Sequence, residues 1–184
     1  MPGQNPAEAV QRFLEPLKRA VSCLGPANLS VSQGGRGKLN ATHAWTLNDG
    51  AGMPLRGALG TFHAGMHYEI VLCDERHEGK WRVTTHEYAY DLVDPGGRRM
   101  WSMHWHPTGM SDYTAPHLHL PFLKDRGHFR EGHRQTFETA VQWCITMGAE
   151  PARDDWEAVL AETEASHVLY RSWSEASDAP PGSR

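Results

Sequence analysis

The chain has 184 residues, of which 39% are hydrophobic, with 18 Lys and Arg against 22 Asp and Glu. This length and apolar content suit a single domain over about residues 1–173, followed at 174–184 by a Ser-, Ala- and Pro-rich tail that is expected to be disordered. The net charge of −4 excludes binding to nucleic acid through overall charge, so any such binding needs a local basic patch.

The location of the protein is predicted from its cysteines and its apolar segments. Cys23, Cys73 and Cys144 are odd in number, far apart and outside any C-x-x-C spacing, so we expect buried free thiols in a reducing compartment. The sequence shows neither the pattern of a secretory signal nor an apolar run of membrane-spanning length. These features predict a soluble cytoplasmic protein that has no membrane partner.

An N-terminal helix is predicted over residues 6–24. Pro6 fits its start, Gly25-Pro26 fits its end, and Pro16 is expected to kink it because the proline ring clashes with the carbonyl of Arg12. The apolar stripe of this helix consists of Val10, Phe13, Leu14, Leu17, Val21 and Leu24. Such a stripe is typical of a helix that covers a core.

The middle of the chain has the pattern of an antiparallel meander. Residues 25–38, rich in Gly, Ser and Asn, are expected to form a loop, whereas residues 39–48, 66–72 and 81–93 favour strands. Asp94-Pro95-Gly96-Gly97 is a hairpin signal that leads into a further strand. Residues 55–63 contain too many glycines for an assignment.

Two C-terminal helices complete the predicted fold. Phe137, Val141, Cys144 and Ile145 form one apolar face that ends near Gly148, and a second helix follows from about residue 154. We therefore expect an α+β fold with an N-terminal helix, a central antiparallel β-sheet, and two C-terminal helices on its apolar face. The last helix also carries acidic residues that face either solvent or a basic partner: Asp154, Asp155, Glu157, Glu162 and Glu164.

Two His-x-His pairs within residues 101–121 are the main functional signal. They are His104/His106 and His117/His119. In a strand, residues i and i+2 point to the same face, so each pair presents two imidazoles on one surface while Trp101, Met103 and Trp105 point into the core. Two antiparallel strands are expected to bring all four imidazoles together.

One interpretation of this cluster is a metal site. Neutral imidazole binds Zn, Fe, Ni and Cu, and a catalytic site keeps three protein ligands and one open position. Four histidines then supply three ligands and one acid/base residue. No carboxylate stands in an evident ligand position, since Asp112 falls in a loop and Asp91 and Asp94 close the preceding strand.

A second interpretation is acid/base cleavage of RNA without a metal. Imidazole can take the proton of a 2′-hydroxyl or protonate the leaving oxygen near neutral pH. His86 and Tyr88 on the neighbouring strand are candidates for substrate binding, with Tyr90 and Tyr113 as further surfaces for base stacking. The candidate phosphate-binding cations are Arg82, Arg99, Lys124, Arg126, Arg130 and Arg134.

The alternative to both is a set of structural histidines. A single histidine on a sheet face is usually a hydrogen-bonded structural residue, and a basic run such as residues 124–134 is usually a solvated loop. Two His-x-His pairs within sixteen residues, each next to a proline, favour a functional site instead. Composition and spacing do not choose between metal and metal-free chemistry.

A resemblance adds to these observations. TTHEYAYDLVDPGGRRMWSMHWHP at 84–107, PHLHL at 116–120 and GAEPARDDWEAVL at 148–160 resemble a family of uncharacterised bacterial proteins with an HWHP…PHLH signature. The likeness covers about residues 66–173 and implies no particular activity. A more distant similarity to small toxins of toxin–antitoxin pairs, which have a PHHKH-type ending, implies an RNA-directed toxin and a small antitoxin partner. The chain departs from that ending in the spacing of His117 and His119, and residues 1–60 lie outside the likeness.

The leading hypothesis is a His-dependent endoribonuclease of toxin or defence type. Its acid/base residues are His104, His106, His117 and His119, and its substrate-binding residues are His86, Tyr88, Arg126 and Arg130. The alternatives are a metalloprotein that binds Zn, Fe, Ni or Mn through the same four histidines, and a binding module without catalysis. The partners expected from the first hypothesis are RNA and a small antitoxin or regulatory protein.

Overall fold

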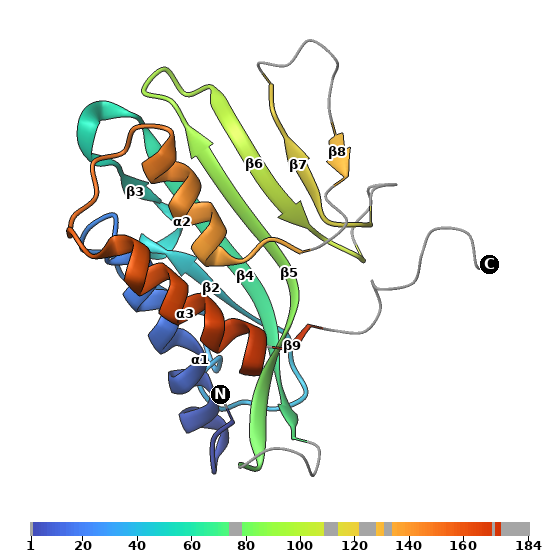
Figure 1. Ribbon diagram of the computed structural model, residues 1–184. Helices are drawn as coiled ribbons and strands as arrows, with labels where there is room; N and C mark the ends of the chain where they lie inside the picture. Colours follow the sequence, from blue (N-terminus) through green and yellow to red (C-terminus); the bar gives the residue numbers. More distant parts are fainter. Residues whose placement is uncertain are drawn as a thin grey trace.

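The computed structural model of the protein describes residues 2–73, 79–108, 114–121, 128–130, 134–170 and 172–173. For 128–130, 167–170 and 172–173 it describes the backbone alone. The fold is α+β, as predicted. One N-terminal and two C-terminal helices lie together on one face of an antiparallel sheet (Figure 1). The opposite face of the sheet carries the histidine pairs.

Helix α1 (Pro6–Val21) begins at a strong cap. Asn5 is in an extended conformation, and its side chain accepts a hydrogen bond of 2.9 Å from the backbone N–H of Glu8. The helix runs through Pro16 and ends at Val21, three residues before the predicted end. Its apolar stripe is buried, including Phe13, which packs against Tyr68 with ring centroids 5.6 Å apart. This stripe anchors α1 to the sheet.

The sheet contains seven strands in which every neighbouring pair is antiparallel, in the order β1-β2-β4-β5-β6-β7-β8. These strands are β1 (Leu29–Val31), β2 (His43–Leu47), β4 (Thr61–Leu72), β5 (Trp81–Val93), β6 (Arg99–Trp105), β7 (His117–His119) and β8 (His128–Arg130). Two short strands join it at the side: β3 (Met53–Pro54) pairs with β4, and β9 (Ser172–Trp173) runs parallel to β5. The consecutive strands from β4 to β8 form the predicted meander.

Three segments differ from the sequence prediction. The predicted loop 25–38 contains β1, whose Leu29 pairs with Leu47 and is buried. Strand β4 begins at Thr61, inside the Gly-rich stretch 55–63, because Thr61, Phe62 and His63 pair with β5. The predicted basic loop contains β8, which pairs with β7. Two 3-10 turns, Asn48–Gly50 and Arg56–Ala58, connect β2, β3 and β4.

Helices α2 (Phe137–Thr146) and α3 (Trp156–Tyr170) complete the core. Thr136 caps α2 by accepting a hydrogen bond from the backbone N–H of Thr139, and Gly148 follows the helix with a φ of 114°. Phe137 packs against aromatic rings from three strands, Trp45, Phe62 and Tyr90, at centroid distances of 5.4, 6.0 and 5.7 Å. The first residue of α2 therefore ties the helical layer to the sheet.

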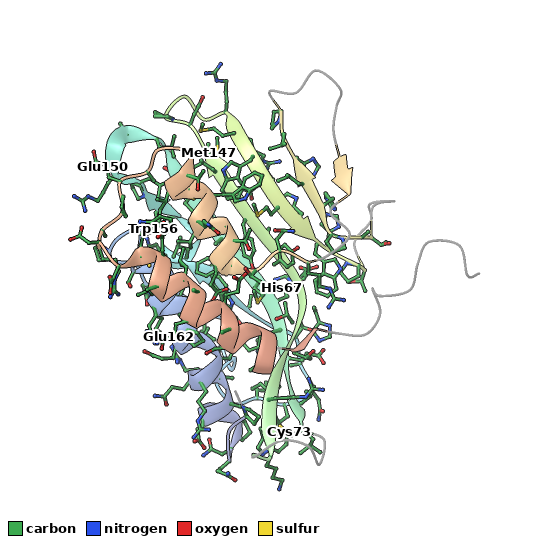
Figure 2. The ribbon with its side chains drawn as sticks, in the orientation of Figure 1. His67, Cys73, Met147, Glu150, Trp156 and Glu162 are labelled. Carbon is green, nitrogen blue, oxygen red and sulfur yellow. The ribbon has the colours of Figure 1, made fainter. Side chains whose placement is uncertain are left out.

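The predicted acidic surface of the last helix is partly neutralised within the chain. Glu162 on α3, labelled in Figure 2, accepts two hydrogen bonds from Arg19 on α1. Asp155, just before α3, accepts two from Arg153. These pairs lower the charge that α3 presents to a basic partner.

The cysteines agree in part with the prediction. Cys23 and Cys144 are buried free thiols, whereas Cys73 at the end of β4 is partly exposed (Figure 2). Within the described parts of the chain, no helix combines the length and apolar character needed to cross a bilayer.

Candidate functional site

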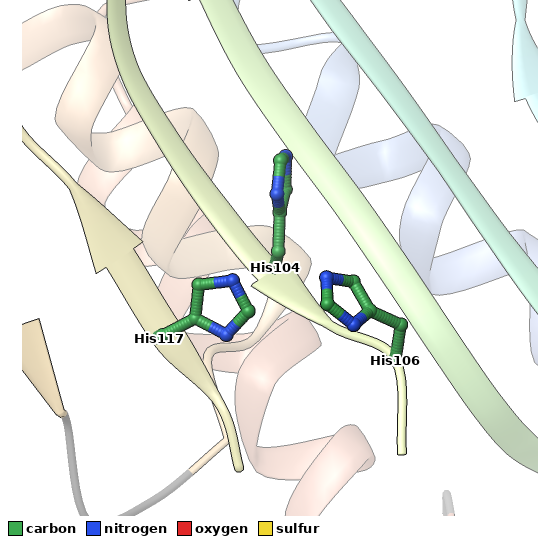
Figure 3. Close-up of side chains that lie close together, drawn as sticks. All are labelled: His104, His106 and His117. Carbon is green, nitrogen blue, oxygen red and sulfur yellow. The ribbon is translucent and has the colours of Figure 1, made fainter. Parts of the chain in front are cut away.

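The two histidine pairs lie side by side on β6 and β7, on the face of the sheet that the helices leave open. In β6, Trp101, Met103 and Trp105 are buried against the helices, as the alternating pattern predicts. In the antiparallel register, His117 lies opposite His104 and His119 lies opposite Ser102. The pairs are therefore offset by two residues, and His106 follows the last residue of β6 (Figure 3).

The four imidazoles form one cluster. Ring centroids are 5.8 Å apart for His104 and His117, 5.0 Å for His106 and His117, and 6.1 Å for His104 and His106. One nitrogen from each of these three histidines lies within 4.8 Å of the other two. His119 stands beside them, with its ring centroid 4.8 Å from that of His117 and 5.3 Å from that of His104.

Asp91 on β5 orients His104. Nε2 of His104 lies 3.1 Å from Oδ1 of Asp91, which also accepts a hydrogen bond from Ser102 Oγ. Burial by itself raises the pKa of Asp91, but hydrogen bonds from His104 and Ser102, with the charges of His104 and Arg99, bring the pKa below its ordinary value. Asp91 is therefore a carboxylate, and a proton on Nε2 of His104 leaves the lone pair on Nδ1.

His117 and His106 differ in whether Nδ1 has a hydrogen-bond partner. Nδ1 of His117 lies 2.9 Å from the carbonyl oxygen of Ala115, so a proton there leaves the lone pair on Nε2. Nδ1 of His106 is buried and has no hydrogen-bond partner among the described residues. A buried polar nitrogen without a partner costs free energy, and metal binding is one way to recover it.

The geometry fits a metal ion after a small adjustment. Nitrogens bound tetrahedrally to one ion at 2.0–2.1 Å are about 3.3 Å apart, whereas those of His104, His106 and His117 are within 4.8 Å. Closure needs each ring to move by about 1 Å, which imidazole reaches through its side-chain torsions. These three histidines would hold the ion on an open face of the sheet, and a site with three protein ligands would keep a further position for water or substrate, as catalytic metal centres do.

The predicted substrate-binding residues are divided between the two faces of the sheet. His86 lies at a bulge in β5, with Nε2 3.4 Å from Glu69 Oε2, an ion-pair distance without hydrogen-bond geometry. The predicted base stacking on Tyr88 and Tyr90 is wrong, because both side chains are buried on the helix-covered face, where their rings stack 4.8 Å apart. They alternate with Ala89, the residue opposite His104, and so point away from the histidines.

The predicted phosphate-binding cations also lie in different parts of the structure. Of these, Arg99 reaches the cluster, with Nε 3.3 Å from Oδ1 of Asp91. The Arg134 guanidinium lies over the ring of Trp105 at 3.8 Å. The β8 register sets Arg130 opposite His117. Lys124, Arg126 and Tyr113 fall outside the described residues.

A shallow depression of about 210 Å³ adjoins the cluster on the same open face. His106 lines one end of it, and a paired His67 and Glu87 line one side. Sequence reasoning missed Asp91, Ser102, His67 and Glu87. The signal that was available is their strand alternation, which puts Glu87, Ala89 and Asp91 on one face of β5.

Comparisons of the chain with protein-family models, curated proteins and solved structures give no significant match. The resemblances drawn from the HWHP…PHLH signature therefore stay predictions, and the site is interpreted from its own geometry.

Proposed function

We propose that His104, His106 and His117 bind one divalent transition-metal ion and that the protein is a metal-dependent hydrolase. The observation that carries the proposal is the convergence of three imidazole nitrogens within 4.8 Å on an open face of the sheet. A set of imidazoles without a carboxylate or a thiolate ligand favours Zn over Mn, with Fe and Ni as further candidates. A metal held in this way acts as a Lewis acid and lowers the pKa of a bound water.

The surroundings of the three histidines support this proposal. Asp91 and the carbonyl of Ala115 accept hydrogen bonds from His104 and His117, the arrangement that fixes the tautomer and orientation of metal-binding imidazoles. His119 lies near both rings without joining the three-nitrogen group. Its role in the proposal is to move a proton to or from the substrate.

A second function is supported by the pairing of Asp91 with His104. A carboxylate that holds an imidazole by hydrogen bond is also how a general base is oriented in metal-free catalysis. Under this proposal His104 and His117 perform acid/base cleavage of RNA, and Arg99 stabilises charge on the phosphate. The protein is then an endoribonuclease of toxin or defence type, and a small antitoxin or regulatory protein is its expected partner.

The free cysteines support a cytoplasmic location under either function. Burial raises the pKa of Cys23 and of Cys144, which keeps both as thiols. Neither is paired in a disulfide, as expected in a reducing compartment.

Elemental analysis of protein purified without a polyhistidine tag tests the leading proposal. We expect about one zinc per chain in the wild type, its loss in His106→Ala, and its retention in His86→Ala, a histidine of the same face outside the three-nitrogen group. A wild type that binds no added zinc, or a His106→Ala variant that binds it equally well, rules the metal centre out. RNA cleavage that persists in EDTA and disappears in His104→Ala then establishes the metal-free function.

A further inference from the structure

The depression beside the histidine cluster is formed by small residues on adjacent strands. In one row across the sheet, Thr46 lies opposite Gly65, Gly65 opposite Ala89, and Ala89 opposite His104. In the next row, Ala44 lies opposite His67, and His67 lies opposite Glu87. The side chains of Ala44, Gly65 and Ala89 are too small to rise above the sheet, so the depression has a flat floor.

Gly65 lies at the centre of the floor and leaves it free of side-chain carbon atoms. A Cβ on this residue would lie 3.2 Å from the carbonyl oxygen of Trp45, which is closer than ordinary van der Waals contact. A larger side chain would also fill the depression. The volume of about 210 Å³ is below the range of about 300–1,000 Å³ that is typical of pockets for drug-sized ligands. The depression therefore has room for one ring rather than for a whole ligand.

The polar groups at its edge set the chemistry of that ring. Glu87 contributes a carboxylate whose side chain is 32% exposed, and one of its oxygens contacts Nδ1 of His67. A carboxylate accepts hydrogen bonds and repels phosphate and carbonyl oxygens. The ligand group that fits a flat floor beside this carboxylate is therefore planar and bears an amino donor on its edge.

We infer that the depression is a base-binding subsite, in which a nucleobase with an exocyclic amino group stacks on the Gly65–Ala89 floor and donates to Glu87. This inference rests on the proposed function, because it places the rest of the nucleotide over the histidine cluster, which shares His106 with the depression. It names single-stranded RNA as the substrate class, since unstacked bases are read by stacking and by hydrogen bonds to their edges.

Cytidine and uridine are the probes that test it. The two nucleosides differ in the group at one ring position, where cytosine has the amino donor that carboxylate side chains accept and uracil has a carbonyl oxygen. Both lack a phosphate, the group of a nucleotide that the inference places over the histidine cluster, so the comparison reports on the depression. Calorimetric titration of the full chain is expected to show that cytidine binds about tenfold more tightly than uridine, because uridine leaves Glu87 without a donor.

Three variants make the result specific. In Glu87→Gln the preference for cytidine is expected to disappear, because the amide can donate to the uracil carbonyl. Glu69→Gln is the matched control and keeps the preference, because Glu69 lies on β4, on the same face of the sheet as Glu87 but outside the depression. Ala44→Leu, on β2 at the end away from the histidines, is expected to weaken both nucleosides by filling the floor.

Equal binding of cytidine and uridine by the wild type, no binding of either, or a preference unchanged in Glu87→Gln would each overturn the inference. Zinc analysis of the same preparations distinguishes a failure of the base-binding subsite from a failure of the metal centre. Stoichiometric zinc with no cytidine binding leaves the proposed function in place and removes the subsite. Cytidine selectivity without zinc leaves the subsite in place and removes the metal centre.

Discussion

Oδ1 of Asp91 on β5 and Nε2 of His104 on β6 lie 3.1 Å apart, and this contact connects the histidine cluster to the interior of the sheet. The same oxygen accepts from Ser102, the residue directly opposite Asp91 in the β5–β6 pairing. His104 is thus held by a carboxylate that is itself held by the neighbouring strand. The position of the imidazole is set by the register of two long strands rather than by a loop.

Asp91→Asn is expected to weaken zinc binding by about 10–100-fold, because the amide keeps the shape of the carboxylate but loses the charge that orients His104. Competition with a chromogenic chelator measures the affinity. The control is Asp94→Asn, which removes a carboxylate paired with Arg98 at the exposed hairpin. Equal zinc affinity in wild type and Asp91→Asn would show that Asp91 has no part in positioning the ligand.

Zinc is expected to raise the melting temperature of the wild type. A ligand that binds the folded state alone stabilises it by about 2.7 kcal/mol at a concentration 100 times its Kd. Thermal unfolding with added zinc, and again after EDTA, measures the shift. His106→Ala should abolish the zinc-dependent part and leave the metal-free melting temperature close to that of the wild type, because His106 Nδ1 makes no hydrogen bond with the described residues. A zinc-induced shift of equal size in this variant would mean that the ion binds elsewhere.

The local patterns predicted the elements but not the register between them. Alternation in β6 placed the tryptophans and histidines on opposite faces correctly, and the hairpin at residues 94–97 placed β5 beside β6. The position of Asp91 opposite Ser102 depends on one extra residue in β6, Met100, at a bulge. The pairing shifts from Val93 opposite Arg99 to Leu92 opposite Trp101, and without that shift Asp91 would lie opposite Trp101, on the core face. No local pattern signals this bulge.

A bulge in β5, next to the depression, decides which face His86 joins. His67 pairs with Glu87 but Tyr68 pairs with Thr85, which leaves His86 as the extra residue. Uninterrupted alternation from Glu87 would put His86 on the core face, whereas the bulge leaves it on the open face, with Nε2 3.4 Å from Oε2 of Glu69. The sequence therefore predicts the histidine cluster, in which each pair has its members two residues apart along the chain, better than the carboxylates around it, which come from β5.

Phe137→Ala is expected to lower the free energy of unfolding by about 3–5 kcal/mol, the usual loss for a fully buried phenylalanine. The ring contacts Trp45, Phe62 and Tyr90, so its removal opens a cavity between α2 and three strands. Denaturant titration gives the value. Leu72→Ala is the control, since Leu72 is 58% exposed and its truncation should change stability by less than about 0.5 kcal/mol. A similar loss in both variants would contradict the placement of Phe137 in the core.

Tyr68 predicts how stability depends on alkaline pH. Burial raises the pKa of its phenol from 10.0 to about 12, against a smaller opposing effect of Arg36, and its hydroxyl donates a hydrogen bond of 2.7 Å to the carbonyl of Gly35. Because the pKa is higher in the folded state, the contribution of Tyr68 to stability is complete below pH 10.0 and is lost as the pH rises through about 12.

Tyr68→Phe should be less stable than the wild type at neutral pH by about 1 kcal/mol, the usual value of one hydrogen bond. The difference should shrink as the pH rises above 10.0, since phenylalanine does not ionise. Denaturant titrations at neutral and alkaline pH measure both values, and a difference that stays constant across this range would show that the phenol of Tyr68 ionises as readily in the folded chain as in the unfolded one.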